Sequence, residues 1–151
     1  MCLINRGPTM KLVKQILQGK TRGVLAISPD ATVYDALKLM AEEEVGALLV
    51  IDADKLVGII TERDYARKVI LHGKSSKEIQ VRDIMTSKIV YVSTMHTVDE
   101  CMALMTDKRV RHLPVYEDNR LVGVVSIGDL VKEAISEREY IIKQLESYIM
   151  G

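Results

Sequence analysis

Apolar positions along the chain follow two different periods. After Thr32, apolar residues recur every three or four positions through residue 40, which predicts an amphipathic helix. The runs Ala47–Ile51 and Leu56–Ile60 have strand length and enclose a polar turn of four residues, Asp52-Ala-Asp-Lys55, which predicts a β-hairpin. A second helix is expected after Thr61, where the apolar run ends.

The same pattern occurs twice. When the sequence is shifted by 65 positions, residues 24–67 align with residues 89–132 without a gap. Leu56-Val57-Gly58 then meets Leu121-Val122-Gly123, and the helix-capping signature Thr32-x-x-Asp35 meets Thr97-x-x-Glu100. Each copy reads as one β-α-β-β-α unit, so the expected fold class is α/β (α+β) with two tandem repeats.

The repeat sets the expected organisation of the chain. We expect an N-terminal extension with a short helix at 1–19, a first repeat at 20–71, a linker at 72–86, a second repeat at 87–135 and a C-terminal helix at 136–151. Neither repeat can cover both faces of its sheet alone, so the two are expected to pack around a pseudo-twofold axis. The apolar stripe of Ile135–Met150 fits either packing within the chain or a dimer contact.

Composition excludes several classes of function. The 21 basic residues balance 21 acidic ones, which argues against bulk electrostatic binding of nucleic acid. Charges interrupt every apolar run well short of the roughly 18 residues that would span a membrane. Two cysteines without a CxxC motif and no visible leader sequence favour a cytoplasmic protein. No motif for a catalytic nucleophile, a Walker loop or a Rossmann site occurs, so no enzymatic activity is expected.

Candidate chemistry lies where each hairpin ends. Thr61 and Ser126 stand at the change from strand to helix, and Asp64 and Asp129 follow three residues later. Free N–H groups at a helix start favour an anion, while a carboxylate can accept from both hydroxyls of a ribose. The spacing therefore suits a nucleoside monophosphate. The same residues also form plain capping boxes, and the two roles can coexist.

These segments resemble the CBS (cystathionine β-synthase) domain pair, or Bateman module. The resemblance rests on Leu56-Val-Gly-Ile-Ile-Thr-Glu-Arg-Asp64, Leu121-Val-Gly-Val-Val-Ser-Ile-Gly-Asp129 and Val110-Arg-His-Leu-Pro-Val115, and covers residues 20–135. It implies a regulatory module without catalytic activity. Its two clefts between the repeats would bind AMP, ADP, ATP, S-adenosylmethionine or NAD(H). It also implies a homodimer of such pairs.

The two clefts are not expected to be equivalent. Arg111 and His112 occupy the positions of Gly46 and Ala47 in the first copy. The resemblance implies that basic residues here contact phosphate, whereas solvation and local hydrogen bonds are the alternative. Gly46-Ala47 would instead let a flat adenine lie against the backbone.

The family pattern also assigns the segments before each first strand to a cleft. It implies that Lys20 and Thr21 line the Asp129 cleft and that Lys88 to Val90 line the Asp64 cleft. The complete set of expected nucleotide-binding residues is Lys20, Thr21, Val45, Gly46, Ala47, Thr61, Arg63, Asp64, Lys88, Ile89, Val90, Val110, Arg111, His112, Ser126, Gly128 and Asp129.

Two functions are compatible with this sequence. The favoured one is an energy or redox sensor that binds an adenine nucleotide and modulates a protein partner that the sequence does not identify. The alternative is an assembly module that dimerises without a ligand. Binding to nucleic acid or a membrane is not expected in either case.

Overall fold

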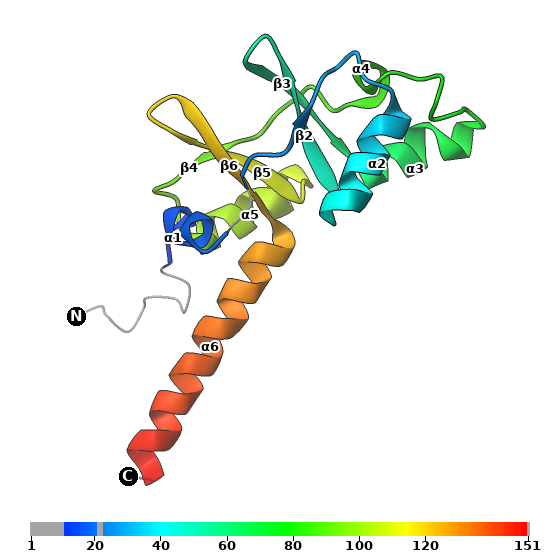
Figure 1. The fold of residues 1–151 in the computed structure, drawn as a ribbon. Helices are drawn as coiled ribbons and strands as arrows, with labels where there is room; N and C mark the ends of the chain where they lie inside the picture. The colour runs from blue at the N-terminus through cyan, green and yellow to red at the C-terminus, as the bar shows by residue number, and fades with distance from the viewer. Residues whose placement is uncertain (1–10, 21–22, 151) are drawn as a thin grey trace. The chain divides into compact units, whose positions relative to one another are not determined.

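The computed structural model describes residues 11–20 and 23–150. For residues 148–150 it describes the backbone alone. Figure 1 shows the order of the elements. The first part contains α1 (Val13–Gln18), β1 (Ala26–Ile27), α2 (Val33–Glu43), β2 (Ala47–Asp52), β3 (Lys55–Thr61), α3 (Glu62–Lys68), the 3-10 helix η2 (Ile70–His72) and α4 (Val81–Ile84). The second contains β4 (Val92–Ser93), α5 (Val98–Lys108), β5 (His112–Glu117), β6 (Arg120–Ser126) and α6 (Ile127–Met150).

The predicted repeat is confirmed as two sheets of the same topology. In each sheet a short first strand pairs in parallel with the second, which forms an antiparallel hairpin with the third: β1-β2-β3 and β4-β5-β6. The hairpin loops are shorter than the four residues expected. Ala53-Asp54 and Asp118-Asn119 both have positive φ, as a two-residue hairpin turn requires.

The predicted caps are also confirmed. The Thr32 hydroxyl accepts a hydrogen bond from the Asp35 N–H at the start of α2, and Thr97 does the same for the Glu100 N–H in α5. Each helix ends in a left-handed residue at the same repeat position, Glu44 and Arg109. Local sequence therefore determines where these two helices begin.

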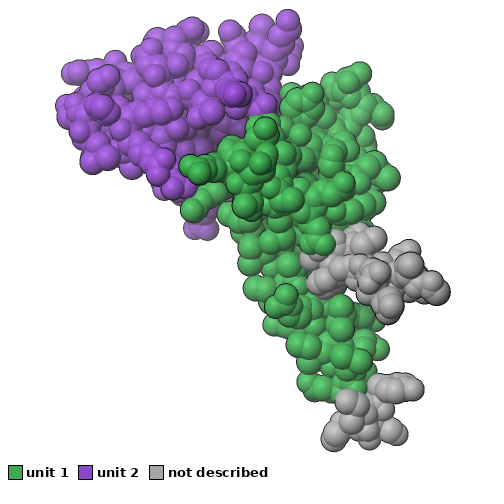
Figure 2. Space-filling model, turned by 180° about the vertical axis from the view of Figure 1, so that it is seen from behind, with its two compact units in different colours: residues 1–23, 90–151 green, residues 24–89 purple. Residues whose placement is uncertain are grey.

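The compact units do not coincide with the sequence repeats. Unit 1 combines residues 1–23 with 90–151, and unit 2 comprises residues 24–89 (Figure 2). Thus α1 packs with the second repeat, although it precedes the first one in the chain. The segment 72–86, expected to be a linker, instead contains α4, whose Val81 and Ile84 are buried in the core of unit 2.

Each unit has its own apolar core. The core of unit 1 contains Val13 and Ile16 of α1, Val98, Cys101 and Met105 of α5, Leu113 and Val115 of β5, Val125 of β6 and Leu130 of α6. The core of unit 2 contains Val33, Ala36 and Met40 of α2, with Leu48, Val50, Ile60, Val69 and the two α4 residues. Burial raises the pKa of the Cys101 thiol to about 11, so this thiol is a packing group rather than a nucleophile at neutral pH.

Strand glycines provide the surface on which α1 and α4 pack. A Cβ on Gly123 in β6 would lie 2.8 Å from a methyl group of Leu17, which is in the last turn of α1. A Cβ on Gly58 would lie 2.7 Å from the sulfur of Met85 and 3.0 Å from the carbonyl oxygen of Thr86. The chain itself, rather than a ligand, therefore fills the space beside both glycines.

Replacing Gly58 with alanine is expected to lower the free energy of unfolding by about 1–3 kcal/mol, because the added methyl group meets backbone at Thr86. Gly123→Ala is expected to cost less, since the tip of the Leu17 side chain can move. Gly23→Ala is the matched control, because nothing lies within 4 Å of its added Cβ. Urea unfolding of the three variants checks this order, and equal losses at Gly58 and Gly23 would contradict it.

Candidate functional site

Both strand-to-helix junctions form a reciprocal capping box. At the end of β6, the Ser126 hydroxyl accepts from the Asp129 N–H (3.1 Å), and Asp129 Oδ2 accepts from the Ser126 N–H (2.8 Å). At the end of β3, Thr61 and Asp64 make the same two bonds at 3.0 Å each. The expected capping boxes are therefore present at both helix starts. In each box the aspartate uses its Oδ2 atom to accept the backbone hydrogen bond.

The second carboxylate oxygen distinguishes the two junctions. Oδ1 of Asp64 lies 3.2 Å from the Lys68 amine and 3.5 Å from the Thr86 hydroxyl. Oδ1 of Asp129 accepts no hydrogen bond from the described residues, whereas Oδ2 accepts from the Ser126 N–H and lies 2.7 Å from the Lys20 amine. Asp129 therefore keeps an acceptor for a ligand, whereas both oxygens of Asp64 have partners within unit 2.

Lys20 reaches Asp129 because α1 packs on β6. Its amine donates to the Val124 carbonyl oxygen at 2.8 Å and also forms the ion pair with Asp129. Lys20 thus lies beside the residue to whose cleft the family pattern assigned it, and its role in binding stays a prediction. Thr21, assigned with it, lies outside the described residues.

Arg111 and His112 lie beside the same junction. His112 is the first residue of β5 and pairs in register with Ser126. The Arg111 carbonyl accepts from the Ile127 N–H at 2.9 Å, so its backbone supports the first turn of α6 while its side chain is exposed. Five of the expected residues therefore meet in unit 1: Lys20, Arg111, His112, Ser126 and Asp129. We call them the unit 1 cluster.

The charge state of the unit 1 cluster follows from its contacts. Burial lowers the pKa of His112, and the neighbouring charges of Lys20 and Arg111 lower it further against the opposing effect of Asp129. Burial raises the pKa of Asp129, but the hydrogen bonds from Lys20 and Ser126 outweigh it and the net shift is downward. At neutral pH the cluster thus holds two cations, one carboxylate and one neutral imidazole.

The corresponding place in unit 2 has different chemistry. The Gly46 carbonyl accepts from the Glu62 N–H at 3.0 Å, which repeats the contact between Arg111 and Ile127. The Glu62 carboxylate also covers Gly46, since a Cβ on this glycine would lie 3.0 Å from Glu62 Oε1. An exposed acidic side chain therefore lies beside Gly46, where a flat adenine was expected to pack, and the expectation itself stays a prediction. Aligning the two repeats could have shown this difference, because the charged Glu62 aligns with the apolar Ile127.

The remaining expected residues are more scattered. Val45 packs against the core of unit 2 and Val110 against that of unit 1, while Ala47 pairs with Thr61 at the start of β2. No hydrogen bond or ion pair among the described residues joins Lys88 or Ile89 to Asp64. Val90 belongs to unit 1, where it packs against the core. Arg63 and Gly128 are exposed in the first turns of α3 and α6.

A hollow of about 720 Å³ lies elsewhere in unit 2, around the end of α3, η2 and α4. Its polar lining includes Lys68 and Lys74 together with Glu78 and Asp83. These charges balance, so the hollow has no preference for an anionic ligand. Lys68 is also held by Asp64 and by the carbonyl oxygen of Ile84 at 2.8 Å.

The described residues include neither a metal site nor a membrane span. They contain no group of three His, Cys, Asp or Glu side chains that could hold a metal ion. Among their helices, none is both long enough and apolar enough to cross a bilayer.

Comparison with known proteins places this chain in a family. The model of the CBS domain matches twice, at residues 13–70 and 81–136, and the chain therefore belongs to the CBS-domain family. A solved Burkholderia ambifaria protein with CBS domains is 53% identical, with a TM-score of 0.81 over 83% of this chain and 95% of its own. The hexameric CBS-CP12 protein of bloom-forming cyanobacteria is 32% identical, with a TM-score of 0.72 over 80% of this chain and 66% of its own.

A curated relative is similar at the level of sequence. The mitochondrial CBS domain-containing protein CBSX3 of Arabidopsis thaliana is 47% identical over 127 residues, which is 81% of this chain. The chain spans 62% of the length of that relative. Because CBSX3 is mitochondrial by name, the cytoplasmic location expected from the sequence stays a prediction.

His112 should make stability depend on pH. As the pH falls below the ordinary histidine value of 6.5, the unfolded chain binds a proton that folded His112 does not, so the free energy of unfolding falls until the lowered pKa is reached. Urea unfolding at several pH values should therefore show a smaller loss in His112→Gln than in the parent. His72→Gln, at an exposed position in η2, is the control and should follow the parent. Equal losses in all three proteins would exclude His112 as the responsible group.

Proposed function

We propose that this chain is a non-catalytic regulatory protein that binds an adenine nucleotide and transmits its level to a protein partner. The single observation that carries the proposal is the unit 1 cluster, which combines a free carboxylate oxygen with two cations and a hydroxyl at a helix start. The chemistry suits AMP, ADP, ATP or NAD(H), all of which contain a ribose and at least one phosphate.

Asp129 is proposed to bind the ribose. Its lowered pKa keeps it ionised at neutral pH, and an ionised carboxylate only accepts hydrogen bonds. With Oδ2 engaged by Ser126, Oδ1 remains to accept from a ribose hydroxyl. Loss of one or two hydrogen bonds to a charged group changes affinity by about 1.5–3 kcal/mol each.

The phosphate is proposed to lie between Ser126 and the two cations. The first N–H groups of α6 favour an anion, and this helix is 24 residues long, whereas α3 has only 7. The Lys20 amine contacts Asp129 and the Val124 carbonyl oxygen, and it can bind a phosphate oxygen instead. A phosphate beside His112 would also favour its protonated form.

Unit 2 supports the proposal less strongly. Asp64 is already bound by Lys68 and Thr86, and Glu62 adds a second carboxylate next to Gly46. We therefore propose that the Asp129 half-site dominates nucleotide affinity. Thr61, Arg63 and Asp64 would contribute a weaker site.

Self-association is also part of the proposal. The CBS-CP12 protein of cyanobacteria is hexameric, which supports an assembly of several copies for this chain too. A homodimer is the simplest such assembly. In this view the nucleotide changes the surface presented to a protein partner, by a modest coupling free energy.

A ligand screen tests the proposal directly. Binding that reaches a concentration of about 100 times Kd stabilises the folded chain by roughly 2.7 kcal/mol. We expect thermal unfolding to shift upward with AMP, ADP, ATP, NAD or NADH and to stay unchanged with GMP or inorganic phosphate. A flat response to every adenosine compound, from protein shown to be free of ligand, would contradict the proposal.

Asp129→Ala should lower nucleotide affinity on the order of 10- to 100-fold, because it removes the acceptor for ribose. Glu100→Ala is the matched control: it removes a capping-box carboxylate of the same type from α5, away from the cluster. Asp64→Ala should have a smaller effect than Asp129→Ala. Titration calorimetry with the ligand found in the screen measures all three. Equal affinity in Asp129→Ala and Glu100→Ala would show that Asp129 is a cap only.

A further inference from the structure

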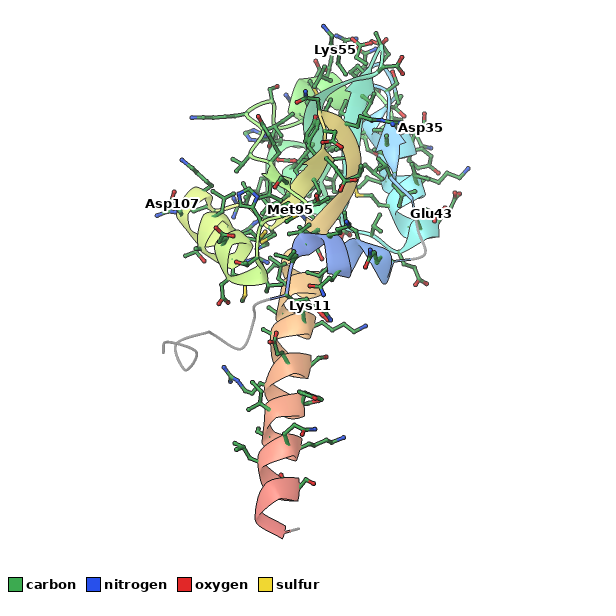
Figure 3. The ribbon with its side chains drawn as sticks, turned by 90° about the vertical axis from the view of Figure 1, so that its left-hand side faces the viewer. Lys11, Asp35, Glu43, Lys55, Met95 and Asp107 are labelled. Atoms are coloured by element: carbon green, nitrogen blue, oxygen red, sulfur yellow. The ribbon has the colours of Figure 1, made fainter. Side chains whose placement is uncertain are left out.

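The outer part of α6 carries apolar side chains that are exposed. Figure 1 shows α6 (orange to red) continuing as one helix beyond the sheet of unit 1, and Figure 3 shows its side chains projecting from it on all sides there. Ile135 is 52% exposed, Ile142 47% and Leu145 57%. An exposed stripe of this kind on a long helix indicates an interaction surface.

The part of the stripe nearest the sheet lies on the side of α6 that faces away from the rest of unit 1. The helix contacts unit 1 through buried Leu130 and through Glu133, which forms an ion pair with Lys11 at 2.9 Å; Figure 3 shows Lys11 beside the first turns of α6. At 100° per residue, these two positions lie on the opposite face from Ile135 and Ile142. As far as the described residues go, its exposed side chains are therefore available to contact another molecule.

The spacing of the stripe matches the seam of a helix pair. Val131, Ile135, Arg138, Ile142 and Leu145 follow one another at intervals of four, three, four and three residues. This alternation is the a/d repeat of two helices that pack along their length. Residues 131–147 contain four acidic and three basic side chains, so the segment does not have the basic polar face that favours a lipid surface.

Charge decides the direction of the pair. A parallel pair in register would place Arg138 against Arg138 at the centre of the seam, which is repulsive. An antiparallel pair centred on residue 140 instead places Ile135 opposite Leu145 and Arg138 opposite Ile142. It also brings Lys132 of one copy to Glu146 of the other at both ends, and at the centre it places Glu139 near both Arg138 and Glu139 of the other copy. Lys132, Arg138 and Glu146 have no partner among the described residues, so they are available for these contacts.

We infer that residues 131–147 of α6 bind the same segment of a second copy of this chain, as an antiparallel helix pair. The inference specifies the surface for the proposed self-association, and it does not depend on nucleotide binding. The test below measures mass and not ligand affinity, so its failure would leave the ligand screen unaffected.

The first experiment measures molar mass by light scattering on the full chain. We expect the parent to have twice the mass of Leu145→Glu, because a charge in the seam prevents pairing. Tyr140→Glu is the matched control: this side chain is 62% exposed on the same helix but lies on the far side from the seam, and its variant should keep the parent mass. Far-UV circular dichroism shows that both variants remain folded.

The second experiment tests the antiparallel register by charge reversal. Lys132→Glu and Glu146→Lys should each lower the association constant about tenfold, and the double variant should restore it. Lys132 and Glu146 are about 21 Å apart along one helix, so they cannot contact each other within one chain. Restoration therefore reports a contact between two copies.

Several results would overturn the inference. Equal masses for the parent and Leu145→Glu would show that α6 does not hold copies together. The same conclusion follows if Tyr140→Glu disrupts the assembly as strongly as Leu145→Glu. If the double charge variant associates no better than the single ones, the antiparallel register is wrong.

Discussion

Leu17 packs on the bare backbone of Gly123, and Met85 with the Thr86 carbonyl packs on that of Gly58. Each sheet can accept its covering segment only because these strand positions carry no side chain. The contact of Leu17 with Gly123 fixes the position of α1 on β6. Gly19 and Lys20, which follow α1, therefore lie beside the junction between β6 and α6. Lys20 reaches Asp129 and the Val124 carbonyl for this reason. The charge state of the whole unit 1 cluster therefore depends on a packing contact several residues away.

The two units use the same backbone for different chemistry. In both, the residue before the second strand accepts a hydrogen bond from the first turn of the following helix, at Gly46 and at Arg111. The side chains at these equivalent places differ in charge: glycine and Glu62 in unit 2, Arg111 and Ile127 in unit 1. A duplicated fold thus keeps its capping boxes, which stabilise the helix starts, while the residues around them vary. Asp64 and Asp129 therefore share the same role in helix capping, whereas the role proposed for them in binding depends on neighbours that differ between the two units.

Local features of the fold could be predicted from the sequence. The helix starts at Thr32 and Thr97, the hairpins and the 65-residue repeat depend on short-range spacing, and the structure has them where expected. The assignment of α1 and α4 to units could not be predicted in this way, because it depends on contacts between distant segments. For the same reason the partners of Asp64 were missed: Lys68 and Thr86 come from different elements and carry no common motif.

Unit 1 is built from both ends of the chain, whereas unit 2 is one continuous segment. During synthesis from the N-terminus, residues 24–89 can therefore complete their core while α1 still lacks the sheet that it covers. Domains generally fold as they emerge, so the central part of this chain is expected to fold before the part that was made first. A fragment cut at the sequence repeat would leave Val13 and Ile16 exposed to water, and fragments intended for expression should follow the packing units instead.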